Sequence, residues 1–160
     1  MSQAGTIDGQ AFARERSRVS GHLALAELPR LAASGGESAD VAFEIEGGRS
    51  AEGHPSLRVR AEGRVGMTCQ RCLQPLTVPV EVDAELELAE SLREAEAAED
   101  EVDRVVASRN MDVAALVEDE LLLALPMVAA HEDCQLPADD DGPAPSPFAG
   151  LAGLRRSGRR

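Results

Sequence analysis

Three cysteines and one histidine have the residue types and the spacing that metal binding requires. Cys69 and Cys72 form a C-x2-C pair, and His131 and Cys134 form an H-x2-C pair later in the chain. Zinc is held by sulfur and nitrogen ligands of this kind, and one tight turn lets both thiolates of a C-x2-C pair reach the same ion. The two pairs together predict one structural Zn2+ bound by all four side chains. The alternative interpretation is three idle thiols and one surface histidine.

Other chemistries find little support in the sequence. A redox C-x2-C motif usually opens a helix, whereas a proline and a strand pattern follow this one. The chain has no Gly-rich phosphate loop, no H-E-x-x-H and no G-x-S-x-G motif. Glu118, Asp119 and Glu120 are expected to form a solvated helix face, with Glu120 nearest the apolar stripe and able to bond inward. His22 and His54 stand alone and are expected at the surface, so the sequence predicts no catalytic residue and no enzyme.

Charge and composition limit the partners that these residues can serve. The chain has 160 residues, a formal charge of −13, and arginine as its only strongly basic residue type. This charge argues against nucleic acid wrapped over the whole surface, but it allows a local basic patch or a basic protein partner. Free or metal-bound cysteines suit a reducing cytosol, and neither a secretory signal nor an apolar run of about 20 residues is present. We therefore expect a cytoplasmic protein without a membrane partner or a small-molecule substrate.

The hydrophobic pattern predicts an α+β fold: an antiparallel β-meander covered by a few helices, with a disordered C-terminal tail. The clearest strands are 57–67 and 78–88, in which apolar residues alternate with polar ones, and the C-x2-C pair lies in the turn between them. The other expected elements are a helix capped by Asp8, strands at 19–25 and 41–45, a short helix begun by Pro29, a short strand near 102–106, and a helix capped by Asp112 and ended by Pro126.

The register of the long hairpin can be inferred from its two faces. If apolar residues face apolar ones, paired residue numbers have an odd sum, and a sum of 145 also matches opposite charges. Three arginines then oppose three glutamates: Arg58 and Glu87, Arg60 and Glu85, Arg64 and Glu81. This pairing predicts a neutralised arginine stripe, and the alternative is a small patch that faces RNA.

The chain divides into one domain and a tail. Residues 1–136 are expected to form a single domain that includes an acidic loop at 89–103, and residues 137–160 a flexible, Pro- and Asp-rich tail ending in an apolar and basic segment. Basic residues near both ends are the candidate contacts to RNA or to a particle: Arg14, Arg16, Arg18, Arg155, Arg156, Arg159 and Arg160.

Several stretches together resemble the YceD family, the large ribosomal RNA subunit accumulation proteins of bacteria and plastids. They are the C-Q-R-C-L-Q-P run at 69–75, the V-E-D-E-L-L-L-A-L-P run at 117–126, His131 and Cys134, the tail at 145–151, and residues 12–16. The resemblance implies a role in the synthesis, processing or stability of 23S rRNA, without an established enzymatic activity. The spacing between the histidine and the last cysteine varies in the family and is short here, which weakens His131 as a ligand more than Cys134.

Three functions therefore remain open. The first is a non-enzymatic ribosome-biogenesis factor that acts on 23S rRNA or on a pre-50S particle. The second is an acidic adaptor that holds a basic ribosomal protein, which the net charge of −13 favours over broad RNA contact. The third is a metal-dependent hydrolase, which ranks last because four protein ligands leave no open position for water.

Overall fold

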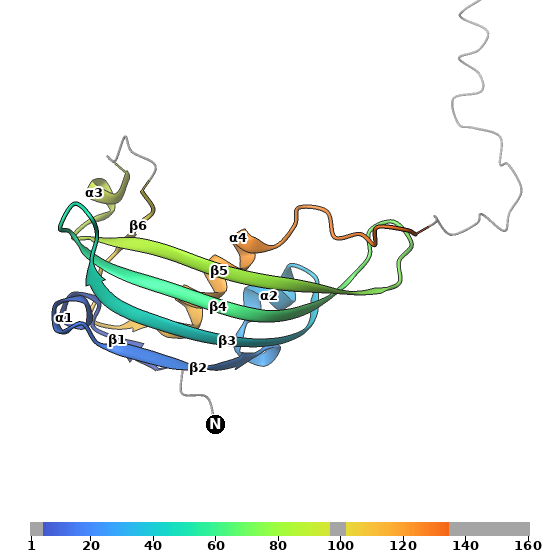
Figure 1. The fold of residues 1–160 in the computed structure, drawn as a ribbon, viewed down its shortest axis with the longest axis horizontal. Coiled ribbons are helices and arrows are strands. Elements are labelled where there is room, and N and C mark those ends of the chain that lie inside the picture. The colour runs from blue at the N-terminus through green and yellow to red at the C-terminus, as the bar shows by residue number, and fades with distance from the viewer. Residues whose placement is uncertain (1–4, 97–101, 135–160) are drawn as a thin grey trace, which may run out of the picture.

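A five-stranded sheet in the order β2-β3-β4-β5-β6 forms the body of the molecule (Figure 1). The computed structural model describes residues 5–96 and 102–134. Strands β2 (Arg18–Ala24), β3 (Gly36–Arg49), β4 (Pro55–Thr68) and β5 (Pro75–Ala89) form an antiparallel meander. The short β6 (Arg104–Val106) joins β5 in parallel. The predicted α+β fold is confirmed, with one parallel edge added to the meander.

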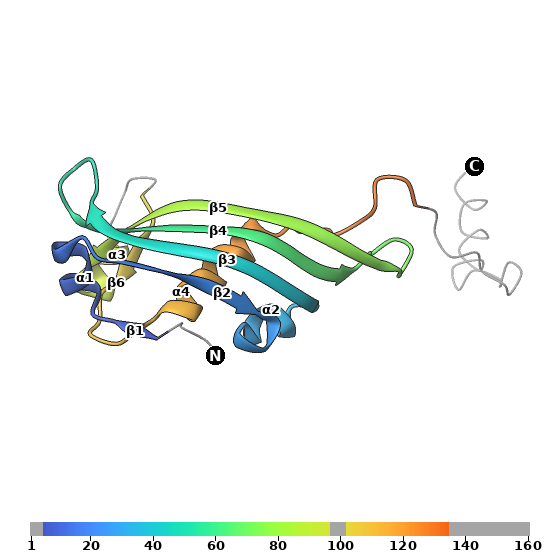
Figure 2. The same cartoon turned by 60° about the horizontal axis from the view of Figure 1, so that its bottom comes forward.

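Helices cover one face of this sheet, and Figure 2 shows α1, α2 and α4 on that side. Two short strands, β1 and β7, pair with each other at the same end as α1. The remaining elements are β1 (Thr6–Ile7), α1 (Gly9–Glu15), the 3-10 helix η1 (Leu25–Glu27), α2 (Pro29–Ala33), α3 (Leu92–Glu96), β7 (Met111–Asp112) and α4 (Val113–Ala124). The candidate tail at 137–160 and part of the acidic loop lie outside the described residues.

Local sequence signals set the helix boundaries. The side chain of Asp8 accepts a hydrogen bond from the Ala11 N–H at 3.0 Å, and Asp112 accepts one from the Ala115 N–H at 3.1 Å. Both are N-caps, which satisfy backbone donors that the first helical turn leaves unpaired. Gly35, with φ 96°, takes the left-handed conformation just after α2.

The core lies between the sheet and α4. One face of the long hairpin is buried, including Val59, Val65 and Leu86, and α4 places Val117 and Leu121 against it. The opposite face carries the charged residues and is open to solvent. Alternation along most of β4 and β5 therefore leaves a broad sheet face that none of the described helices covers, as Figure 2 shows.

The predicted register of the hairpin is wrong by two residues. In the structure Arg58 lies opposite Glu85 and Arg60 opposite Asp83, while Arg64 lies opposite Pro79. In both the predicted and the observed register, the numbers of paired residues add up to an odd total. The apolar faces therefore match in either register, and the hydrophobic pattern alone does not distinguish the two. The turn decides: the Cys69 N–H donates to the Gln74 carbonyl at 2.9 Å, which closes the hairpin around the C-x2-C pair.

The expected inward role of Glu120 is also wrong, because Glu118 is the buried acid. Its side chain is 3% exposed and reaches α2. The carboxylate accepts the backbone N–H groups of Arg30 at 2.7 Å and Leu31 at 3.0 Å, and it pairs with the Arg30 guanidinium at 2.8 Å. Glu118, which lies on α4, thus caps the first turn of α2, whose backbone N–H donors would otherwise be unsatisfied.

A second buried acid, Glu87, ties the far end of the hairpin together. Its carboxylate lies 3.1 Å from the His54 imidazole and 3.1 Å from the Arg104 guanidinium. The nearby Ser50 hydroxyl, the His54 imidazole and the Arg104 guanidinium lower the pKa of Glu87 to about 2. These contacts favour the ionised form of the Glu87 carboxylate. The contacts from His54 and Arg104 also join the loop after β3 to strand β6.

Because the pKa of Glu87 is lowered in the folded protein, we expect the free energy of unfolding to decrease as the pH falls. An unfolded glutamate titrates near about pH 4.3, so the contribution of Glu87 is complete above that value and is lost as the pH falls through 2. Glu87→Gln should lower the free energy of unfolding by about 2 kcal/mol at neutral pH, measured by urea denaturation. The deficit should shrink toward pH 2. An equal deficit in the control Glu15→Gln, which changes an exposed glutamate at the end of α1, would contradict this prediction.

Candidate metal centre

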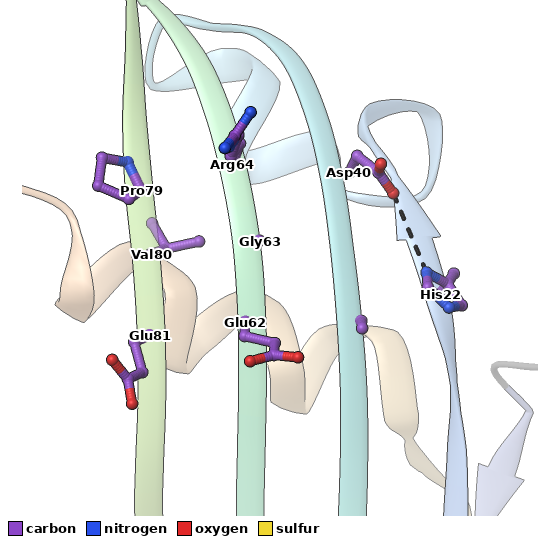
Figure 3. A pocket seen from close by; sticks show the side chains of 9 residues that line it. His22, Asp40, Glu62, Gly63, Arg64, Pro79, Val80 and Glu81 are labelled. Atoms are coloured by element: carbon purple, nitrogen blue, oxygen red, sulfur yellow. Dashed lines mark ion pairs between the residues drawn. The ribbon is translucent and has the colours of Figure 1, made fainter.

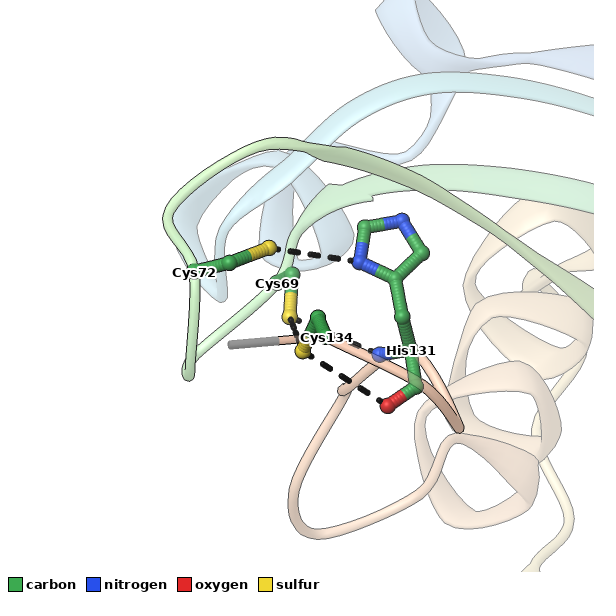
Figure 4. Close-up of side chains that lie close together, drawn as sticks. All are labelled: Cys69, Cys72, His131 and Cys134. Carbon is green, nitrogen blue, oxygen red and sulfur yellow. Dashed lines mark hydrogen bonds between the residues drawn. The ribbon is translucent and has the colours of Figure 1, made fainter. Parts of the chain in front are cut away.

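The hairpin turn between β4 and β5 presents the first two candidate ligands. Cys69 follows the last residue of β4, and its carbonyl accepts a hydrogen bond from the Leu73 N–H at 2.9 Å. Leu73 takes a left-handed conformation with φ 61° although its side chain is bulky. This reversal turns the chain back into β5 and leaves Cys69 and Cys72 on one side of the turn (Figure 4).

The segment after α4 brings the second pair to the same place. The Gln70 N–H donates to the Ala129 carbonyl at 2.8 Å, and the Arg71 guanidinium donates to the Cys134 carbonyl at 2.8 Å. These two bonds hold residues 129–134 across the turn. The structure therefore brings together all four side chains that the sequence predicted as metal ligands.

The four ligand atoms form a compact group. They lie within 4.8 Å of one another, with Cys69 Sγ 3.7 Å from Cys134 Sγ and Cys72 Sγ 3.4 Å from His131 Nδ1 (Figure 4). A tetrahedral ion with bonds of about 2.3 Å to sulfur and 2.0–2.1 Å to nitrogen separates its ligands by about 3.8 Å for two sulfurs and about 3.5 Å for sulfur and nitrogen. Both measured separations fit such an ion.

His131 is oriented for metal binding by its other nitrogen. Nε2 lies 3.1 Å from the Pro75 carbonyl oxygen, which can only accept. Nε2 therefore carries the proton and Nδ1 presents its lone pair toward Cys72. A carbonyl partner of this kind fixes the ring and its tautomer in many metal sites. This contact supports His131 as the fourth ligand despite its short spacing from Cys134.

The electrostatics of the cluster favour a thiolate at Cys69. This side chain is buried, and hydrogen bonds from backbone N–H groups, chiefly that of Cys72, lower the pKa of Cys69 to about 5. Burial raises the pKa of Cys134. A thiolate is the form that binds metal, so Cys69 is prepared for this role without a change of conformation. The Cys3His cluster can hold a metal ion.

The predicted basic contacts are not gathered in the same way. Arg14 and Arg16 lie exposed at the end of α1. Arg18 pairs with Glu44 at 3.3 Å and with Glu46, so its charge is already compensated. The C-terminal arginines lie outside the described residues, and their role stays a prediction.

The sequence analysis missed a second group of potential ligands at the opposite end of the sheet. Glu52, His54 and Glu87 place ligand atoms within 4.8 Å of one another. However, Arg104 contacts the same Glu87 oxygen as His54, so a cation there would compete with a guanidinium. We interpret this group as a structural ion-pair cluster. No spacing in the sequence points to it, because one loop supplies Glu52 and His54 while the distant strand β5 supplies Glu87.

The fold and the cluster define an α+β protein whose half-covered sheet ends in a candidate structural metal centre. The model of the YceD family, described as large ribosomal RNA subunit accumulation protein YceD, matches residues 57–155. The chain belongs to this family, as the resemblance implied. The match contains all four cluster residues, and the family description supports a role in ribosome biogenesis.

No solved structure matches the chain. In the described part of the chain, no helix is long and apolar enough to span a membrane.

Proposed function

We propose that this protein is a non-enzymatic assembly factor that supports the synthesis, processing or stability of 23S rRNA in the cytoplasm. Membership of the YceD family carries this proposal. The candidate metal centre supports a structural role for the ion, because Cys69, Cys72, His131 and Cys134 would complete a tetrahedral shell. A closed shell leaves no position for an activated water, so the site favours binding over hydrolysis.

Zn2+ is the ion that this donor set fits best. Three thiolates and one imidazole are typical ligands of structural zinc, and hard cations such as Mg2+ prefer oxygen. Bound zinc would supply a cross-link between the β4–β5 turn and residues 129–134, in addition to the hydrogen bonds that already join them. The ion would therefore stabilise one end of the sheet.

The charge distribution favours contact with a particle over tight binding of naked RNA. The formal charge is −13, and the arginines Arg18, Arg58 and Arg60 are occupied by carboxylates in the described sheet. Phosphate binding needs uncompensated positive charge. We therefore propose contact with the pre-50S particle, and an adaptor role toward a basic ribosomal protein is the second candidate function.

Cells that lack the protein should test the main proposal. We expect their 23S rRNA to fall relative to 16S rRNA, and the tagged protein in normal cells to co-sediment with large-subunit precursors in a sucrose gradient. Re-expressed Cys69→Ser protein should restore rRNA less well than the Glu96→Gln control, which changes an exposed side chain of α3 and leaves the metal centre intact. An unchanged rRNA ratio in the deletion strain, together with protein only at the top of the gradient, would refute the proposal.

A further inference from the structure

The open face of the sheet carries an ordered array of charges. Its residues lie in rows that cross the strands, and two of these rows place acids beside arginines: Arg18, Glu46, Arg58 and Glu85 in one, and Ser20, Glu44, Arg60 and Asp83 in the next. Several members pair directly, since Arg58 contacts Asp83 at 2.7 Å and Arg60 contacts Glu46 at 3.3 Å. This half of the face is largely self-neutralised.

The next row breaks the alternation. It runs from His22 through Ala42 to Glu62 and Glu81, and the two glutamates are direct cross-strand partners on β4 and β5. Both side chains are exposed, and neither forms an ion pair with a described residue. Like charges placed directly opposite each other destabilise a sheet. The fold therefore keeps two repelling carboxylates, whereas the two preceding rows pair their acids with arginines.

The surface is hollowed at this row. A hollow of about 740 Å3 is lined by His22, Glu62, Glu81 and neighbouring residues, and an adjoining one of about 520 Å3 shares these three residues. The small side chain of Ala42 belongs to both linings. Figure 3 shows Glu62 and Glu81 on neighbouring strands, with Arg64 further along β4.

We propose that this uncovered sheet face docks an extended, Arg- or Lys-rich polypeptide segment of a partner protein, with cations seated between Glu62 and Glu81. The inference rests on the proposed function, because it assigns the basic partner of the assembly factor to one surface. A guanidinium or ammonium group would relieve the repulsion between the two carboxylates, whereas an RNA phosphate would increase it. From β2 to β5 the row spans about 14 Å, which about four extended residues cover.

The probe is a fluorescent peptide of alternating arginine and serine, titrated with the full-length protein and followed by anisotropy at about 0.15 M salt. The double variant Glu62→Gln/Glu81→Gln should weaken peptide binding about fivefold, while its melting temperature stays equal or rises. The matched control Glu15→Gln/Glu96→Gln makes the same charge change outside the face and should alter affinity by less than about twofold. Ala42→Arg, which places a cation in the hollow, should also weaken binding.

Equal affinities for the double variant and its control would overturn the inference. So would unchanged peptide affinity together with tighter binding of a 23S rRNA fragment by the double variant, because the face would then meet RNA. Co-sedimentation with large-subunit precursors tests the proposed function separately. A wild-type protein that binds the peptide through Glu62 and Glu81 but never sediments with precursors would support the docking face and refute the assembly role.

Discussion

Cys69→Ser protein should purify without the zinc ion that we expect each unaltered chain to carry. Cys69 is the buried member of the cluster and lies 3.7 Å from Cys134, so its loss removes a central ligand and leaves three. Structural zinc contributes its binding free energy to folding. We expect the free energy of unfolding to fall by at least about 3 kcal/mol, because the ion holds the β4–β5 turn to residues 129–134.

Metal content and stability should be measured on the same tag-free preparations, by elemental analysis and by urea denaturation. His131→Ala is the second test variant, and His22→Ala is the matched control, because His22 lies on the open sheet face away from the cluster. His131→Ala should lose zinc, and His22→Ala should retain it. Metal-free wild-type protein whose melting temperature does not respond to a chelator would show that the four residues are idle thiols and a histidine.

Glu118→Ala should strongly destabilise the protein, although the residue lies outside the metal centre. It removes the acceptor of two backbone N–H groups at the start of α2 and the partner of Arg30. Buried donors left without an acceptor cost far more than the net value of a hydrogen bond. We expect a loss of about 3 kcal/mol in the free energy of unfolding, measured by chemical denaturation.

The neighbouring Glu120→Ala variant is its matched control. It lies on the same helix and makes the same change, but burial and nearby acids raise the pKa of Glu120, so its ionised form is disfavoured in the folded state. At neutral pH its removal should leave stability equal or slightly higher. A comparable loss in both variants would indicate a helix-propensity effect and contradict the capping role of Glu118.

Local signals in the sequence determined most of the secondary structure. Asp8 and Asp112 mark helix starts because a short acceptor side chain satisfies a backbone donor two or three residues away. Alternation of apolar and polar residues identified β4 and β5, since successive side chains of a strand point to opposite faces. The same spacing logic selected the four candidate metal ligands, because the residue types themselves carry that chemistry.

Tertiary structure alone decided which of these residues meet. The hairpin register agrees with a turn that the Cys69 N–H closes on the Gln74 carbonyl, and the odd-sum rule does not distinguish registers that differ by two residues. The buried acid of α4 is Glu118 instead of Glu120, because α2 lies against that side of the helix and offers its unpaired backbone N–H groups. The repelling pair on the open face likewise exists only once β4 and β5 are in register. Periodicity identifies the face on which a side chain lies, but long-range packing determines the partner opposite it.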